Sequence, residues 1–197
     1  NYALCIMRHY IFTLFLISLF GCATPKKLND NFCSENKEVN LFAFVGRKIS
    51  VVEFDPNAEE TGEKVYDTIS GDTIIKKSYI MDVGFRCKYE IIKNVFNDPK
   101  IDTIDFVAYD HYGSPGFVEY DTVLLYISKS LEGNIYFYQK YQFDYLERNS
   151  DGVFYGYIYD RVETRKRIIF KNKRIASLED LFSKKKEEVF KSFFKNK

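Results

Sequence analysis

The clearest pattern in the chain is a strict alternation of residue types between Met81 and Ile91. The odd-numbered positions are apolar, aromatic or Cys, and the even-numbered positions are Gly or charged residues. Successive side chains of a strand point to opposite faces, so the alternation predicts a long β-strand with one face on a core and one in solvent. At Ile92, Val95 and Phe96 the apolar phase shifts, which indicates a bulge or the end of this strand.

A second pattern is an unbroken apolar run, Leu41–Val45, followed by Gly46 and then by a further apolar stretch up to Phe54. We expect one long strand with a bulge or bend near Gly46. The segments 65–70 and 73–78 flank Gly71-Asp72, and this arrangement predicts a hairpin. Further strands are expected at 101–109, 123–128, 135–145, 153–159 and 162–170.

The end of the chain has helical character. Ser177 precedes two acidic residues, as a helix N-cap does, and no Pro or Gly interrupts 177–195. The apolar residues fall on one helical stripe: Leu178, Leu181, Phe182, Val189 and Phe193. We therefore expect an all-β fold, an OB-like partly closed β-barrel with a C-terminal α-helix. A two-sheet sandwich or a lipocalin-like barrel is the alternative, because more than five strands are readable.

The first 21 residues predict an export signal. Arg8, next to Met7, precedes the uncharged and mostly apolar run Ile11–Phe20, and Gly21-Cys22 follows. The run has about ten residues, whereas a helix that spans a membrane needs about 20. A signal-peptide helix fits this order of charge, apolar run and small residue. We interpret Met7 as the translation start and residues 1–6 as upstream translated sequence.

Leu19-Phe20-Gly21-Cys22 resembles a bacterial lipobox. The resemblance implies that the Cys22 thiol carries fatty acyl chains such as palmitate and becomes the first residue of the mature protein. It also implies a lipoprotein of the bacterial cell envelope, anchored to a membrane through Cys22 and facing the periplasm or the cell surface. Residues 22–39 are polar and predict a flexible tether, and 40–197 predict a single domain.

The composition limits the classes of partner, metal and cofactor that we expect. The chain has sixteen Tyr, nineteen Phe and no Trp, and its formal net charge is +1, so nothing favours nucleic acid. It has no Cys-x-x-Cys and no Cys/His cluster, and the acidic loop at 55–63 lacks a calcium pattern, so we predict no metal and no cofactor. Cys33 and Cys87 remain in the mature chain, either as a disulfide in an oxidising compartment or as two free thiols.

Several strands resemble those of netrin-like modules, which are related to tissue inhibitors of metalloproteinases. Asn40–Val52 resembles their first strand, Phe85–Phe96 their long second strand, and Asp102–Tyr109 and Val123–Ser128 the next two. The resemblance implies an OB-type five-stranded barrel with helices packed against it. Ser114-Pro115-Gly116 stands where that family often has Cys-Gly. Protease inhibition in the family uses the free amine of an N-terminal Cys, and a lipidated Cys22 could not supply one.

Two groups of residues are candidate sites. Asp110, His111 and Ser114 share a short loop and could form a small hydrolase site, although neighbours in sequence rarely make a triad and the usual elbow motif is missing. The tyrosine-rich stretch could be a recognition face or could simply stabilise a sheet. The candidate binding residues are Tyr136, Tyr138, Tyr155, Tyr157 and His111.

We expect a non-enzymatic binding or interaction lipoprotein, with no catalytic residues, whose partner is an envelope protein or a glycan. The alternatives are the small envelope hydrolase and a barrel that carries a ligand in an internal cavity.

Overall fold

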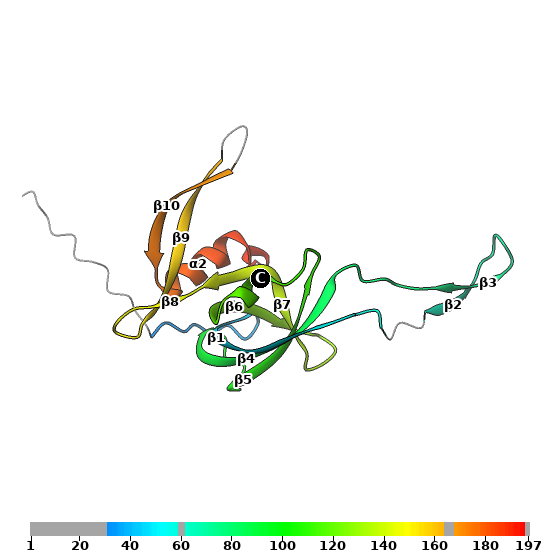
Figure 1. The fold of residues 1–197 in the computed structure, drawn as a ribbon, viewed down its shortest axis with the longest axis horizontal. Helices are drawn as coiled ribbons and strands as arrows, with labels where there is room; N and C mark the ends of the chain where they lie inside the picture. Colours follow the sequence, from blue (N-terminus) through cyan, green and yellow to red (C-terminus); the bar gives the residue numbers. More distant parts are fainter. Residues whose placement is uncertain (1–30, 59–61, 164–167, 196–197) are drawn as a thin grey trace, which may run out of the picture.

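Five strands close into a ring in the computed structural model, which describes residues 31–58, 62–163 and 168–195 (Figure 1). The strands are β1 (Phe42–Phe54), β4 (Val83–Phe96), β5 (Thr103–Asp110), β6 (Thr122–Lys129) and β7 (Tyr136–Tyr145). They follow the order β1-β4-β5-β7-β6, and β6 pairs with β1 to complete the ring. All of these pairs are antiparallel except β5 with β7. The expected all-β class is confirmed.

The long alternating strand lies where the sequence predicted it. Phe85, Cys87 and Tyr89 of β4 are buried inside the ring, whereas Arg86 and Lys88 are exposed on its outer face. The predicted irregularities are also present, since the pairing of β4 with β1 skips Ile92 and Val95. The skipped Ile92 lies opposite the step from Val45 to Gly46 of β1, so the bulge expected near Gly46 is present too. Bulges of this kind increase strand twist and help a short sheet curve into a ring.

The interior of the ring is filled by packed side chains. Phe117, on the short 3-10 helix η1 (Gly116–Glu119) between β5 and β6, enters it and is completely buried. Its ring contacts those of Tyr89, Phe106 and Tyr138 at centroid distances of 6.0, 5.9 and 4.6 Å.

A second core lies outside the ring, between the outer faces of β1 and β6 and the C-terminal helix α2 (Leu178–Glu188). Ser177 caps the helix: its side chain accepts from the Asp180 backbone N–H, and the Asp180 carboxylate accepts in return from the Ser177 N–H. The expected helix is therefore confirmed, but it ends at Glu188 and a second 3-10 helix, η2 (Lys191–Phe194), follows.

The early end of α2 changes its predicted apolar stripe. Leu178, Leu181 and Phe182 are buried as expected, and Phe182 stacks on Phe96 at 4.8 Å. Val189 and Phe193, which the stripe included, are 41% and 36% exposed. Phe190 is buried against Tyr126 in their place, because the chain leaves the helical path after Glu188.

Residues 31–39 pack on the ring, although the sequence predicted a flexible tether up to residue 39. The Ser34 N–H donates to the Val95 carbonyl oxygen at 3.0 Å. The Asn97 side-chain amide donates to the carbonyl oxygens of Asn36, Val39 and Leu41 at 3.1, 3.1 and 2.8 Å. The signal peptide, Cys22 and the rest of the tether lie outside the described residues.

The remaining strands form two smaller sheets. β9 (Phe154–Glu163) pairs with β10 (Ile168–Ala176) and with the short β8 (Glu147–Arg148). The prediction of a single strand at 162–170 is therefore wrong. The two ends of this stretch belong to two antiparallel strands, in which Glu163 of β9 pairs with Ile168 of β10. The extra strands that suggested a sandwich or a lipocalin-like barrel belong to this separate sheet and to the two-stranded sheet of β2 and β3.

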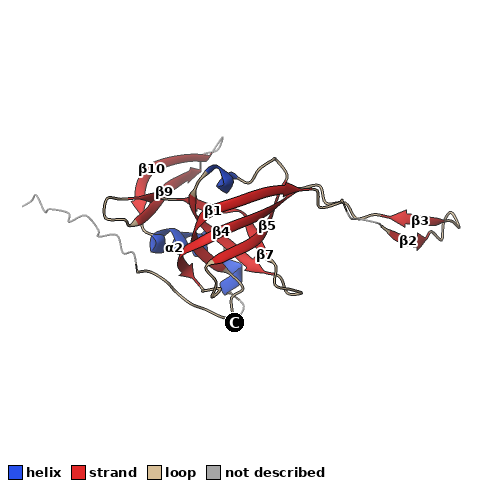
Figure 2. Ribbon diagram, turned by 60° about the horizontal axis from the view of Figure 1, so that its bottom comes forward, coloured by secondary structure: helices blue, strands red, loops and turns tan. Residues whose placement is uncertain are grey.

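The predicted hairpin is also present. β2 (Glu63–Tyr66) and β3 (Thr73–Lys76) form a two-stranded arm that projects far from the ring (Figures 1 and 2). Gly71 at its turn has a φ of 76°, a conformation that favours glycine. The arm has no core beneath it, and Ile69 at its tip is 95% exposed.

Candidate binding surfaces

A row of aromatic side chains crosses the outer face of the ring. Phe54 of β1 contacts Tyr109 of β5 at a centroid distance of 6.2 Å, and Tyr109 stacks on Phe137 of β7 at 6.5 Å. We call Phe54, Tyr109 and Phe137 the aromatic row. β4 lies between β1 and β5, and the row crosses it at Gly84, where a Cβ atom would approach the Phe54 ring to 2.5 Å. Any larger residue at Gly84 would displace the first ring of the row.

Two hollows flank the aromatic row. One, of about 550 Å³, is lined by Val52, Arg86, Val107 and Ile135, among others, and the Arg86 guanidinium lies 4.4 Å from the centre of the Phe54 ring. The other, of about 390 Å³, includes Val107 together with Tyr109 and Phe137. A continuous, partly apolar surface therefore runs across β1, β4, β5 and β7. Aromatic rings with a cation beside them are suited to flat or ring-shaped groups of a ligand.

His111 lies near one end of this surface, with a partner that the sequence did not suggest. Its Nδ1 atom is 3.3 Å from a carboxylate oxygen of Asp82, whose other oxygen lies 2.6 Å from the Lys140 ammonium. The hydrogen bond and charge of Lys140, with a smaller effect of His111, lower the pKa of Asp82 below its usual value. Asp82 and Lys140 both line the second hollow.

The loop arrangement proposed for a hydrolase is not formed. The Asp110 side chain is buried and accepts a hydrogen bond from the Tyr112 N–H, so His111 is paired with Asp82 and not with Asp110. Ser114 is exposed on the loop. Within the described residues no group of three or more His, Cys, Asp and Glu side chains is placed to hold a metal ion.

The tyrosine-rich stretch is divided between two places. Tyr138 is buried inside the ring, and Tyr136 packs edge-on against Phe42 at 5.6 Å. Tyr138 points into the ring because β7 is irregular. Tyr141 has a φ of 64°, and the register of pairing with β6 shifts between Phe143 and Tyr138. Tyr138 was a candidate binding residue, but its burial leaves it stabilising the sheet and not available at the surface.

Tyr155 and Tyr157 do lie together on the surface of β9. Their hydroxyl groups donate to the same Glu147 carboxylate oxygen, at 2.7 and 2.9 Å. The Tyr145 ring lies 5.8 Å from that of Tyr157 and stacks on Tyr120 at 5.2 Å. We call these four tyrosines and Glu147 the tyrosine cluster. The hydrogen bond to Glu147 raises the pKa of Tyr157 to about 12, and the two tyrosines lower that of Glu147.

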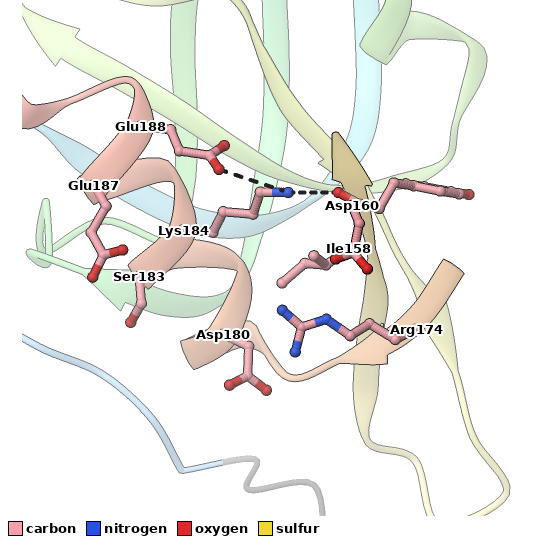
Figure 3. A pocket seen from close by; sticks show the side chains of 9 residues that line it. Ile158, Asp160, Arg174, Asp180, Ser183, Lys184, Glu187 and Glu188 are labelled. Atoms are coloured by element: carbon pink, nitrogen blue, oxygen red, sulfur yellow. Dashed lines mark hydrogen bonds and ion pairs between the residues drawn. The ribbon is translucent and has the colours of Figure 1, made fainter. Parts of the chain in front are cut away.

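A third hollow, of about 490 Å³, lies between α2 and the β9–β10 hairpin (Figure 3). Lys184 spans it, since its ammonium donates to the Tyr159 carbonyl oxygen at 3.1 Å and lies 4.0 Å from the Glu188 carboxylate. Asp160, Arg174 and Glu187 complete a lining of mixed charge. Sequence reasoning missed this hollow, because only the tertiary structure brings its helix and hairpin together.

Cys33 and Cys87 are free thiols in the structure, so of the two alternatives the disulfide is not formed. Cys33 is exposed beside Ser34, which pairs with the end of β4, whereas Cys87 is buried inside the ring earlier on that strand. Ser34 bonds to Val95, which lies eight residues after Cys87 on β4, and eight residues of strand span about 26 Å. A disulfide needs its Cα atoms within about 7 Å. Burial raises the pKa of the Cys87 thiol to about 12.

Comparisons with protein-family models, with curated proteins and with solved structures found no match. Among the residues that the structure describes, no helix is long and apolar enough to cross a membrane.

Proposed function

We propose that this protein is a lipid-anchored, non-enzymatic binding protein of a bacterial cell envelope, and that it holds a glycan on the outer face of its five-stranded ring. The observation that carries the proposal is the aromatic row of Phe54, Tyr109 and Phe137 with a hollow on each side. The row lies across the strands, so several rings of an extended ligand can contact it in succession.

The topology supports an OB-type interpretation of the ring. Counted in chain order, the ring strands follow the order first, second, third, fifth, fourth, and the third and fifth pair in parallel. OB-folds bind oligonucleotides and oligosaccharides on the face of their second and third strands, between the loops after the first and fourth. Here those strands are β4 and β5, and the loops carry the β2–β3 arm and Ile135.

The charges of the outer face favour a glycan over nucleic acid. Arg86, Lys88 and Lys140 are accompanied by Asp82, Glu90 and Asp105, so the face has no excess of positive charge. Binding to a phosphate backbone depends on such an excess. Sugar rings need none, since they stack on aromatic faces and their hydroxyl groups bond to polar side chains of either charge.

The binding test uses the full chain in detergent and a panel of soluble oligosaccharides from bacterial cell walls, with affinity measured by calorimetry. Tyr109→Ala and Phe137→Ala should each weaken binding at least about tenfold, or 1.4 kcal/mol. Phe170→Ala is the matched control, because Phe170 is 67% exposed on β10, outside the ring. A panel with no binder, or equal affinities in all three variants, would overturn the proposal.

The anchor has its own test. Cys22→Ser should abolish incorporation of a fatty-acid analogue and move the protein out of the membrane fraction. Equal labelling of the variant and the natural chain would refute lipidation at Cys22, and the glycan proposal would then stand without its anchor.

The other two functions receive less support. A hydrolase would need a nucleophile beside an oriented base; Asp82 orients His111, but among the described residues no hydrogen bond links His111 to Ser114. His111→Ala is expected to leave glycan binding intact and to remove no activity. A carrier would need an internal cavity, and the ring interior is occupied by large side chains such as Phe44, Tyr89 and Phe117.

A further inference from the structure

We propose that the tyrosine cluster is a binding site for a quaternary ammonium group, and that Lys173 occupies this site in the free protein. The site lies on the β8–β9–β10 sheet and Tyr145, so it is separate from the aromatic row of the ring. It goes beyond the glycan proposal and does not depend on it.

The cluster already holds a cation on an aromatic face. The Lys173 ammonium lies 3.4 Å from the centre of the Tyr157 ring, well inside the distance of about 6 Å at which such contacts are attractive. The Tyr145 ring is inclined by 37° to that of Tyr157, and the Tyr145 hydroxyl accepts a hydrogen bond from the Lys173 ammonium, so the two side chains form a shallow cage. Partial burial lowers the pKa of Lys173, but the combined effect of Tyr145, Tyr157 and Tyr159 raises it by more, so the pKa lies above its ordinary value.

Apart from the hydrogen bond between Lys173 and Tyr145, the cage is held in place by contacts that do not involve Lys173. The Glu147 carboxylate accepts from both Tyr155 and Tyr157, which fixes a negative charge beside the rings. Tyr155 packs edge-on against Tyr157 at 5.8 Å and 82°. Tyr145 is supported from the other side by its stack on Tyr120. Removing Lys173 should therefore empty the cage without collapsing it.

An irregularity of β10 delivers Lys173 to the cage. The pairing of β10 with β9 is regular up to Lys171 and resumes at Arg174. Between them Asn172 has a φ of 51°, in the left-handed region, and its amide lies 3.1 Å from the Asp160 carboxylate. Bulges often redirect a side chain next to a binding site. Without this bulge, Lys173 would continue the regular alternation of the strand.

Aromatic faces together with one carboxylate select a cation, and a quaternary ammonium suits them best. A primary ammonium such as Lys173 is strongly hydrated and makes part of its contacts with water, whereas N-methyl groups can contact several rings at once. The expected ligand is a small compound with a trimethylammonium group, of the choline type. Lys173 competes with it from within the chain, so the natural protein should bind such ligands weakly.

The test titrates the full chain in detergent with tetramethylammonium and with choline, and follows binding through the tyrosine NMR signals. Lys173→Met, which keeps the apolar stem and removes the charge, should bind both probes at least tenfold more tightly than the natural protein. Adding Tyr157→Ala to Lys173→Met should abolish the gain. Lys171→Met is the matched control, because Lys171 is an exposed lysine two residues earlier on β10.

Lys173→Gln serves as a second variant in which the lysine charge is removed from the cage, and we call these two the opened variants. Thermal melts check that each variant is folded. Failure of both opened variants to bind either probe would overturn the proposal, as would an equal gain in Lys171→Met, which would indicate a general charge effect. Glycan affinity measured on the same samples should be unchanged, so the two proposals can fail separately.

Discussion

The two walls of the ring differ in how they are covered. β1 up to Gly46 and β6 are buried on both faces: Phe44 and Leu125 point into the ring, and Val45 and Leu124 point into the core beneath α2, all four with no exposed surface. On the opposite wall, β5 and the part of β4 before Ile92 are buried only on the inside, whereas Val95 and Phe96 at the end of β4 belong to the core beneath α2. The outer face of this wall carries exposed charges and the hollows beside the aromatic row.

This difference was already present in the chain as two kinds of hydrophobic pattern. Leu41–Val45 and Val123–Tyr126 are continuous apolar and aromatic runs, as expected of strands covered on both sides. The stretch from Met81 to Ile91 alternates, as expected of a strand with one wet face. The pattern therefore indicates which wall supports the fold and which wall remains free to bind a ligand.

The largest effect should come from the interior that both walls share. Phe85→Ala removes a buried aromatic ring from β4 and should lower the free energy of unfolding by about 3–5 kcal/mol. Arg86→Ala, on the wet face of the same strand, should change it by no more than about 0.5 kcal/mol. Urea melts compare the two, and equal losses would mean that β4 is covered on both sides.

A second comparison uses only outward-facing residues. Leu124→Ala opens a cavity beneath α2 and should cost about 2–5 kcal/mol. Val52→Ala changes a residue that is 58% exposed on the part of β1 beyond Gly46, beside the hollow that Arg86 lines, and should cost less than about 0.5 kcal/mol. A small loss for Leu124→Ala in the same urea melts would show that the helix is not firmly packed on the ring.

Local signals predicted much of this fold correctly. The alternation of β4, the bulge positions Ile92 and Val95, and the Ser177 cap each depend on neighbours in sequence, and each is present. The burial of Tyr138 could not be predicted, because the extra residues of β7 around Tyr141 change which side chains point into the ring, and nothing in the residue types marks that change.

The candidate sites were less predictable, because they depend on contacts between distant segments. The hydrolase alternative paired His111 with Asp110, its neighbour, whereas the structure pairs it with Asp82 from the connection between β3 and β4. Tyr155 and Tyr157 were identified from their spacing, but the carboxylate that joins them, Glu147, and the Lys173 ammonium come from other strands. Only the tertiary structure reveals such sets.

A matched pair of Tyr→Phe changes compares the two cores more finely. The Tyr126 hydroxyl, beneath α2, donates to Asp144 at 2.9 Å, so Tyr126→Phe should cost about 1–3 kcal/mol. The Tyr89 hydroxyl is buried in the ring and has no hydrogen-bond partner among the described residues. Tyr89→Phe should therefore raise stability by up to about 1 kcal/mol. Thermal melts that gave equal losses would show that Tyr89 is bonded in solution.

The smallest expected effect is the pH dependence of stability that Asp144 contributes. Asp144 lies on β7 and contacts both Tyr126 of β6 and Lys185 of α2. Burial raises the pKa of its carboxyl above the ordinary value, although Lys185 and the Tyr126 hydroxyl act in the opposite direction. The folded state therefore binds this proton more tightly than the unfolded state, in which the pKa is about 3.9. The contribution of Asp144 to stability is greatest below that pH and decreases as the pH rises through the folded pKa.

Asp144→Asn keeps an oxygen acceptor for Tyr126 and cannot ionise. Relative to the natural protein, the variant should be least stable near pH 3.5 and should gain steadily toward pH 7, because only the natural chain then has to bury a carboxylate. Urea melts at a series of pH values measure this difference. If the variant became less stable relative to the natural protein as the pH rises, the Lys185 ammonium, 3.9 Å away, would lower the Asp144 pKa by more than burial raises it. Helix α2 would then be held to the covered wall by an ion pair as well as by its apolar core.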